Sequence, residues 1–128
     1  MMKRIFSLVI LLCFGFTSFS QAVKTDDVVS FKTIKHSFGK IKQNKPVTYT
    51  FELKNKGSRP LIIEQATAQC GCTTPEYSKK PILKNKTIPL KVTFNAATPG
   101  PFTKTVMVKF LLIQEPTILT IEGEVIGK

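Results

Sequence analysis

The stretch Val47-Thr48-Tyr49-Thr50-Phe51-Glu52-Leu53-Lys54 decides the fold, because the character of its side chains changes at every residue. The odd-numbered residues are apolar or aromatic, and the even-numbered residues are polar or charged. Successive side chains of a β-strand point to opposite faces, so the pattern predicts a strand with one buried and one solvent-facing side. Half-buried strands of this kind are typical of antiparallel sheets.

The same alternation recurs along the chain. It is clear in three later segments: Ile88–Phe94, Val106–Phe110 and Leu119–Val125. Three shorter or less regular segments are also predicted to be strands: Val28–Ile34, Phe38–Ile41 and Leu61–Ala68. Short strands separated by turn-forming residues are typical of a sandwich or barrel. We therefore predict an all-β fold, an immunoglobulin-like antiparallel β-sandwich of about seven strands. Pro89 cannot donate a hydrogen bond to a sheet, which predicts an edge position for its strand.

The N-terminus has the layout of a secretory signal peptide. Lys3 and Arg4 form a short basic region, and the apolar stretch 5–16 follows them. This stretch is shorter than the roughly 20 apolar residues that a transmembrane helix needs. The sequence therefore predicts an exported protein, periplasmic or extracellular; the alternative is an uncleaved membrane anchor.

Small residues give two candidate cleavage sites, after Ser20 and after Ala22. We predict a signal peptide at residues 1–20 and a single domain at residues 21–128. Cys13 would be lost with the signal, because a leucine precedes it where a lipid-modified cysteine needs a small residue. No other apolar run is long enough to span a membrane, so we expect a soluble mature domain.

Charge limits the classes of partner. The chain has 19 basic and 8 acidic residues, a formal net charge of +11. Removal of Lys3 and Arg4 leaves 17 basic against 8 acidic residues, or +9. Such a charge favours nucleic acid or an anionic surface in some proteins. Here the lysines are scattered and Arg59 is the only arginine left, whereas nucleic-acid readers favour arginine. We expect a lysine-rich solvated surface and no nucleic-acid partner.

The mature chain keeps two cysteines, Cys70 and Cys72, on either side of Gly71 and just before Thr73. One interpretation is a local disulfide, because exported compartments are oxidising and Gly71 would help the chain to turn tightly. The closed ring is so small that it would stabilise the fold little. A strained bond of this kind is more easily reduced, and would be a redox handle more than a staple.

Two other interpretations of the cysteine pair stay open. Two thiolates would bind a soft metal such as Cu(I), whereas zinc needs four ligands and His36 is the only histidine. Alternatively, the thiols are small apolar side chains at a turn. We predict a candidate disulfide or thiol site at Cys70 and Cys72, with Gly71 and Thr73 as the supporting turn and no metal or cofactor.

No catalytic constellation is visible in the sequence. A Ser-His-acid triad would have to use His36, and no Gly-x-Ser-x-Gly run surrounds any serine. Glu122 and Glu124 lie two residues apart on one face of a predicted strand, a spacing that would suit a pair of catalytic carboxylates. Such pairs are far more often part of a solvated outer face. We expect no enzymatic activity.

Several runs of residues together resemble a known family. They are Phe38–Ile41, Val47–Gly57, Pro60–Ile63, Cys70–Thr73, Val92–Asn95, Gly100–Lys104 and Ile121–Val125. The chain resembles the bacterial domain of unknown function 1573 family from about Val29 to Val125. Its specific part is Cys-Gly-Cys-Thr after a Pro-Leu-Ile strand. The resemblance implies an exported immunoglobulin-like sandwich with no established enzymatic activity, and it assigns no role to the cysteines.

One departure from the family pattern is visible. The family commonly has a Pro-Gly turn where this chain has Leu83-Lys84-Asn85-Lys86. Asn85 can adopt the left-handed conformation that glycine would supply, so we expect the turn to be kept.

The leading hypothesis is an exported, non-enzymatic binding or structural module whose partner is an unknown protein or a surface glycan. It follows from a well-patterned sandwich without an active-site constellation. The alternative is a periplasmic thiol-redox or copper-handling protein that uses Cys70 and Cys72. A third, weaker hypothesis is an electrostatic binder of an anionic polymer.

Overall fold

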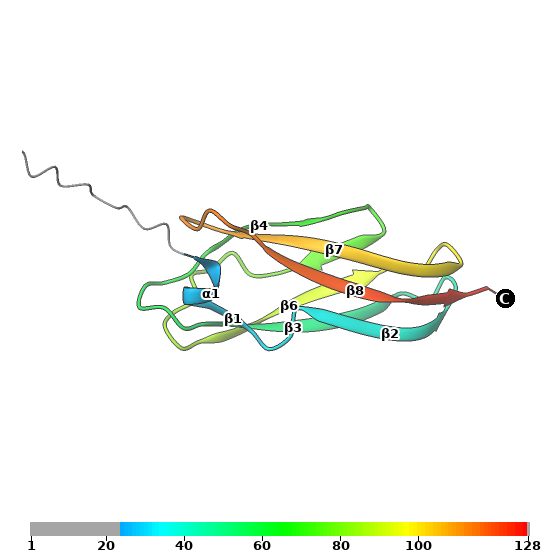
Figure 1. The fold of residues 1–128 in the computed structure, drawn as a ribbon, viewed down its shortest axis with the longest axis horizontal. Helices are drawn as coiled ribbons and strands as arrows, with labels where there is room; N and C mark the ends of the chain where they lie inside the picture. The colour runs from blue at the N-terminus through cyan, green and yellow to red at the C-terminus, as the bar shows by residue number, and fades with distance from the viewer. Residues whose placement is uncertain (1–23, 128) are drawn as a thin grey trace, which may run out of the picture.

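The computed structural model describes residues 24–127 (Figure 1). The predicted signal peptide, its two cleavage sites and Cys13 lie outside the described residues. The described chain contains one short helix and eight strands: α1 Thr25–Val28, β1 Val29–Phe31, β2 Lys35–Lys42, β3 Val47–Asn55, β4 Ile63–Ala68, β5 Thr73–Glu76, β6 Thr87–Phe94, β7 Gly100–Phe110 and β8 Thr117–Ile126. Within this part of the chain, no helix has the length and apolar character that a membrane crossing requires.

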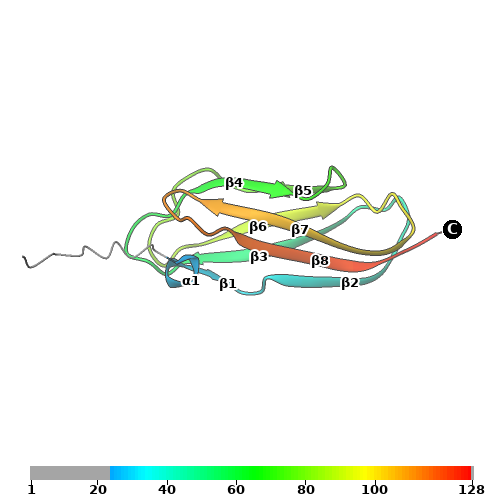
Figure 2. The ribbon, with the colours of Figure 1, turned by 45° about the horizontal axis from the view of Figure 1, so that its top comes forward.

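The strands form two sheets of four, in the orders β1-β3-β6-β5 and β2-β8-β7-β4. The predicted all-β sandwich is confirmed, with eight strands instead of about seven. The second sheet is mixed and not purely antiparallel, because β2 pairs with β8 in parallel. The cause is the link between β1 and β2: the chain leaves one sheet and continues in the same direction along the edge of the other. In Figure 2, β1 and β2 follow one long edge of the sandwich, and β4 and β5 follow the opposite edge.

The core lies between the two sheets, where the inward-facing side chains meet. The alternation that predicted β3 is realised, since Phe51 and Leu53 are both 0% exposed. Phe94 and Phe102 stack across the sheets with ring centroids 4.1 Å apart. Eighteen apolar residues form one continuous buried cluster. The two sheets therefore share one hydrophobic core.

Two strand predictions need correction. The predicted strand Leu61–Ala68 begins at Ile63, and Leu61 instead forms an isolated bridge with Ile82. Strand β5 was not predicted, because its sequence Thr-Thr-Pro-Glu has no apolar alternation; it pairs with β6 alone. A strand bonded along one edge can tolerate a proline.

The edge position predicted from Pro89 is wrong for the strand as a whole, because β6 lies between β3 and β5. However, β5 pairs only with Lys91–Phe94 of β6, so Pro89 lies beyond the end of that pairing. Its missing N–H therefore breaks no ladder to β5. The expected turn at Asn85 is present, and its φ of +63° is in the left-handed region.

The loops gather at two opposite ends of the sandwich. The end that carries α1, here the α1 end, has the loops 56–62, 77–86 and 111–116. The other end, here the disulfide end, has the loops 43–46, 69–72 and 95–99 together with the C-terminus (Figure 1). Any surface built from loops therefore belongs to one end or the other.

Candidate functional site

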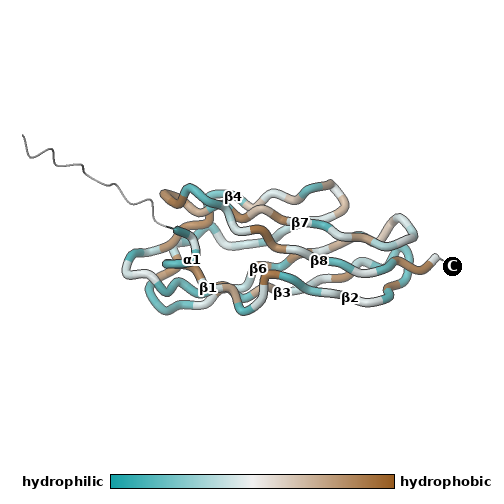
Figure 3. Tube along the Cα trace, in the orientation of Figure 1, coloured by the Kyte–Doolittle hydropathy of each residue, from teal (hydrophilic) through white to brown (hydrophobic). Residues whose placement is uncertain are grey.

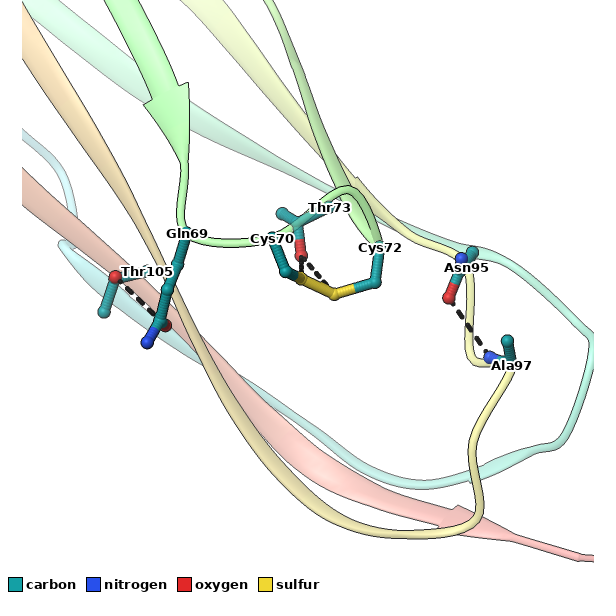
Figure 4. Close-up of a disulfide and its surroundings, with 7 residues drawn as sticks. All are labelled: Gln69, Cys70, Cys72, Thr73, Asn95, Ala97 and Thr105. Carbon is teal, nitrogen blue, oxygen red and sulfur yellow. Dashed lines mark hydrogen bonds between the residues drawn. A yellow bond between two sulfur atoms is a disulfide. The ribbon is translucent and has the colours of Figure 1, made fainter.

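The candidate site is the four-residue loop 69–72 at the disulfide end, which joins β4 of one sheet to β5 of the other. A disulfide links Cys70 and Cys72 inside this loop, with the two Cα atoms 5.3 Å apart (Figure 4). Both cysteines are half-buried, and Gly71 between them is exposed. The disulfide thus closes a ring at the point where the chain crosses between the sheets.

Thr73 supports the disulfide from the buried side of the loop. Its side chain is almost fully buried, at 3% exposure, although it is polar. The hydroxyl Oγ1 lies 3.8 Å from the sulfur of Cys70 and 3.7 Å from the sulfur of Cys72 (Figure 4). Disulfide sulfurs carry no hydrogen, so the hydroxyl is the donor in this weak, shared contact. The buried hydroxyl therefore finds its partner in the disulfide itself.

Backbone hydrogen bonds fix the loop on both sides. The amide of Gln69 donates to the carbonyl of Thr105 on β7 over 3.0 Å. The carbonyl of Cys72 accepts from the amide of Asn95 over 2.9 Å. Within the loop, the amide of Thr73 donates to the carbonyl of Cys70 over 3.3 Å. The loop is thereby held to both sheets.

Gly71 does not have the role expected of it. Its φ lies outside the left-handed region that favours glycine, and a Cβ built on it would meet nothing within 4 Å. The turn therefore does not need glycine for its conformation or for space. What the small residue does provide is an uncovered tip above the disulfide.

A metal site at the cysteines finds no support from their neighbours. Among the described residues, no group of three or more Cys, His, Asp or Glu side chains could hold an ion. His36 lies on β2, at the edge of the second sheet opposite to β4. Three strand spacings separate the two edges, roughly 14 Å. His36 is therefore not brought to the cysteine pair.

His36 instead belongs to an aromatic cluster between the sheets. Its ring stacks on Tyr49 with centroids 3.7 Å apart and 7° between the planes. Phe38 meets it edge-on at 4.8 Å. These contacts extend the apolar core toward the β1–β2 edge, which is a packing role.

The two carboxylates at positions 122 and 124 lie on the outer face of β8. Glu122 forms a salt bridge with Lys35 of the neighbouring strand, with an Nζ–Oε2 distance of 3.3 Å. Glu124 is exposed and sits beside Lys40. Each carboxylate has a lysine beside it and faces solvent. The two glutamates therefore belong to an ordinary charged outer face of the sheet.

Asn55 holds two loops together through its side chain, a role that the sequence analysis did not predict. It is 0% exposed, and its amide nitrogen donates to the carbonyls of Arg59 over 2.7 Å and of Ile82 over 2.8 Å. Its side-chain oxygen accepts from the amide of Gly57 over 2.9 Å. The side chain therefore binds two loops of the α1 end together. Its place in a turn-like run favoured a surface role and hid this function.

The comparison with protein families gives one match. The sequence profile of the family described as "Protein of unknown function (DUF1573)" matches residues 29–125. This range covers all eight strands almost completely. No curated protein matches the sequence.

Solved structures show the same fold at low sequence identity. A PapD-like domain of human CEP192 superposes with a TM-score of 0.70 at 9% identity, over 85% of this chain and 92% of that one. A protein of unknown function from Porphyromonas gingivalis W83 gives 0.65 at 12% identity, over 76% of this chain but less than half, 46%, of that one. The Vibrio cholerae protease VesB gives 0.63 at 11% identity, over 79% of this chain and 33% of that one. These likenesses show the sandwich alone.

Proposed function

The chain belongs to the DUF1573 family, and from this premise we propose that it is an exported, non-enzymatic binding module of the cell envelope. Its disulfide-closed loop 69–72 is the contact point, and the partner is a protein or a surface glycan. The fold is consistent with a binding or structural module, since PapD-like and immunoglobulin-like sandwiches present loops on a rigid core.

One observation carries the proposal: the loop is exposed at its tip and fixed at its base. Gly71 has open space around its Cα, while the side chain of Thr73 is 3% exposed and contacts both sulfurs. A surface loop that is already ordered loses little conformational entropy when a partner binds it. The geometry therefore suits recognition by a preformed contact.

The chemistry of the described residues favours binding over turnover. The only described histidine is stacked against Tyr49, and the disulfide holds both cysteines without a free thiolate. A thiolate is needed for nucleophilic attack or metal binding. While the bond is closed, the loop offers shape and backbone groups and no reactive group.

Photocrosslinking from position 71 tests the proposal. A photoreactive residue replaces Gly71, where a side chain has open space, in the exported full chain produced in its own host. The matched control carries the same residue at Thr50, which is exposed on the outer face of β3. We expect a discrete, saturable crosslink from position 71 that excess unmodified protein removes, and none from position 50. Equal crosslinking from both positions, or turnover that depends on Cys70, would contradict the proposal.

A thiol-redox or copper-handling role is the second candidate, favoured by the half-buried position of both cysteines. Reduction would take two electrons and two protons from a thiol donor and would release two thiols. A titration of the reduced chain with Cu(I) in competition with a chromogenic chelator tests this role. Tight binding of one ion that is lost in Cys70→Ser supports it, and failure to compete with the chelator rules out copper handling.

A further inference from the structure

A second surface lies at the α1 end, away from the disulfide loop. Three leucines in its loops are exposed: Leu83 at 56%, Leu111 at 45% and Leu112 at 89%. Both leucine-bearing loops adjoin the loop 56–62, because the amide of Leu111 donates to the carbonyl of Ile62 and residues 61 and 82 form a bridge. In Figure 3 the tip that joins β7 to β8 is coloured as strongly hydrophobic and projects from the sandwich. We call these three residues the leucine tip.

Both the backbone conformation and the exposure of Leu112 are energetically unfavourable. Its φ of +65° is in the left-handed region, which disfavours any side chain with a Cβ. Its side chain is also almost fully in water. At other turns among the described residues the left-handed position is held by Asn44 and Asn85, which tolerate it well, and by Ala96, whose small side chain is buried. A strained backbone that displays an apolar side chain points to a function for that side chain.

A concavity beside the leucine tip extends the apolar surface. Its volume is about 330 Å³, and it is lined by Val28, Ser58, Arg59, Pro60, Leu61, Leu111, Leu112 and Ile113. Most of these side chains are apolar, and Arg59 is the cation among them. An apolar hollow with one cation at its rim is suited to a ligand that is both apolar and anionic.

The charge of the α1 end matches such a ligand. The loops 56–62 and 77–86 contain six basic residues and no acidic one. With residues 24–28 and the loop 111–116, the end has seven basic and three acidic residues, Asp26, Asp27 and Glu115, so its net charge is +4. The loops 43–46, 69–72 and 95–99 of the disulfide end contain one basic residue, Lys45, and no acidic one, a net +1. Positive charge is thus concentrated where the leucines are.

From these observations we propose that the α1 end docks on an anionic lipid bilayer. Leu83, Leu111 and Leu112 enter the boundary between headgroups and acyl chains, and the surrounding lysines and Arg59 lie at the level of the lipid phosphates. Apolar insertion combined with attraction to anionic headgroups is how peripheral proteins bind membranes. This surface acts independently of loop 69–72, since the length of β4, roughly 20 Å, separates them.

The test uses residues 21–128, which contain every residue of the buried apolar cluster, and vesicles of phosphatidylglycerol and phosphatidylcholine in equal amounts. We expect binding by co-sedimentation that weakens as salt rises and is absent on pure phosphatidylcholine. Leu112→Gly removes the side chain and also relieves the backbone strain. It is expected to lower the partition coefficient at least about tenfold while the Tm stays unchanged or rises. The control Met107→Ser, 44% exposed on the outer face of β7, is expected to bind like the natural chain.

Two double charge variants test whether the vesicles are attracted by the lysines of the α1 end or by the net charge of the whole protein. Lys84→Glu with Lys86→Glu acts at the α1 end, and Lys40→Glu with Lys42→Glu makes the same change in net charge on β2. We expect the first pair to weaken vesicle binding at least about tenfold and the second to leave it within about twofold. Equal loss in both pairs, unaltered binding of Leu112→Gly, or no binding to anionic vesicles would overturn the proposal; in the last case a protein partner becomes the occupant to seek.

Discussion

Buried polar side chains organise the loops at both ends of this sandwich. Asn55 uses both side-chain atoms to bind the loops of the α1 end, and Thr73 supports the disulfide at the opposite end. Neither residue is apolar, yet both are at most 3% exposed. A buried polar group is tolerated only when its hydrogen bonds are made, so each fixes the shape of the loops around it.

Removal of the Asn55 side chain is expected to destabilise the domain strongly. Asn55→Ala leaves the carbonyls of Arg59 and Ile82 and the amide of Gly57 without their partner, at a cost of about 2–4 kcal/mol. Asn95→Ala is the matched control, because its exposed side chain accepts a single bond from Ala97. It should cost less than about 1 kcal/mol in urea unfolding. Similar losses in both variants would show that Asn55 does not bind the loops.

Two glycines differ in the space around them, and their alanine variants should therefore differ in stability. Gly71→Ala is expected to be neutral or to stabilise the fold by about 0.5 kcal/mol, because the new methyl group meets open space. A Cβ at Gly123 would lie 2.7 Å from the carbonyl oxygen of Gly39 and 2.9 Å from the ring of Phe102. Gly123→Ala should therefore cost about 1–3 kcal/mol in thermal or urea unfolding. A loss of that size for Gly71→Ala would mean that the loop does need glycine.

At the scale of elements, the alternation of apolar and polar residues predicted the half-buried strands. It did not predict β5 or the exposed leucines, whose sequences do not alternate. β3, β6, β7 and β8 follow the period of two, so their faces could be read directly. β5 has no such pattern and is defined by its pairing with β6, a long-range contact. The leucine tip was also missed, because Leu111 and Leu112 directly follow the predicted strand Val106–Phe110 and carry no turn signal of their own. Only the turn geometry shows that Leu112 points into solvent.

The disulfide is expected to contribute little to stability. It closes a ring of only three residues, and the loop-entropy estimate for such a ring is about 1.5 kcal/mol. Reduction should therefore lower the free energy of unfolding by no more than this and leave the domain folded, as followed by circular dichroism during urea titration. The double variant Cys70→Ser/Cys72→Ser should not respond to reductant. Unfolding on reduction would show instead that the bond is a structural staple.

At the scale of the whole molecule, the fold separates two surfaces along its long axis. The disulfide end offers a rigid loop of little charge, and the α1 end combines three exposed leucines with a net charge of +4 over its loops and residues 24–28. A module with this layout would rest on a membrane by one end and meet its envelope partner with the other. The overall surplus of lysine predicted a solvated surface, and the separation into two unlike ends emerges only from the topology.

The central claim is that the Cys70–Cys72 disulfide stays formed and that its loop is a binding surface and not a reactive centre. The most direct test is the intact mass of the protein purified from its native compartment, with free thiols alkylated at lysis and metal content measured on the same sample. We predict an unalkylated chain, lighter than its reduced form by the two hydrogens of one disulfide, and no bound metal. A chain with both cysteines alkylated, or one that carries copper lost in Cys70→Ser, would contradict the claim.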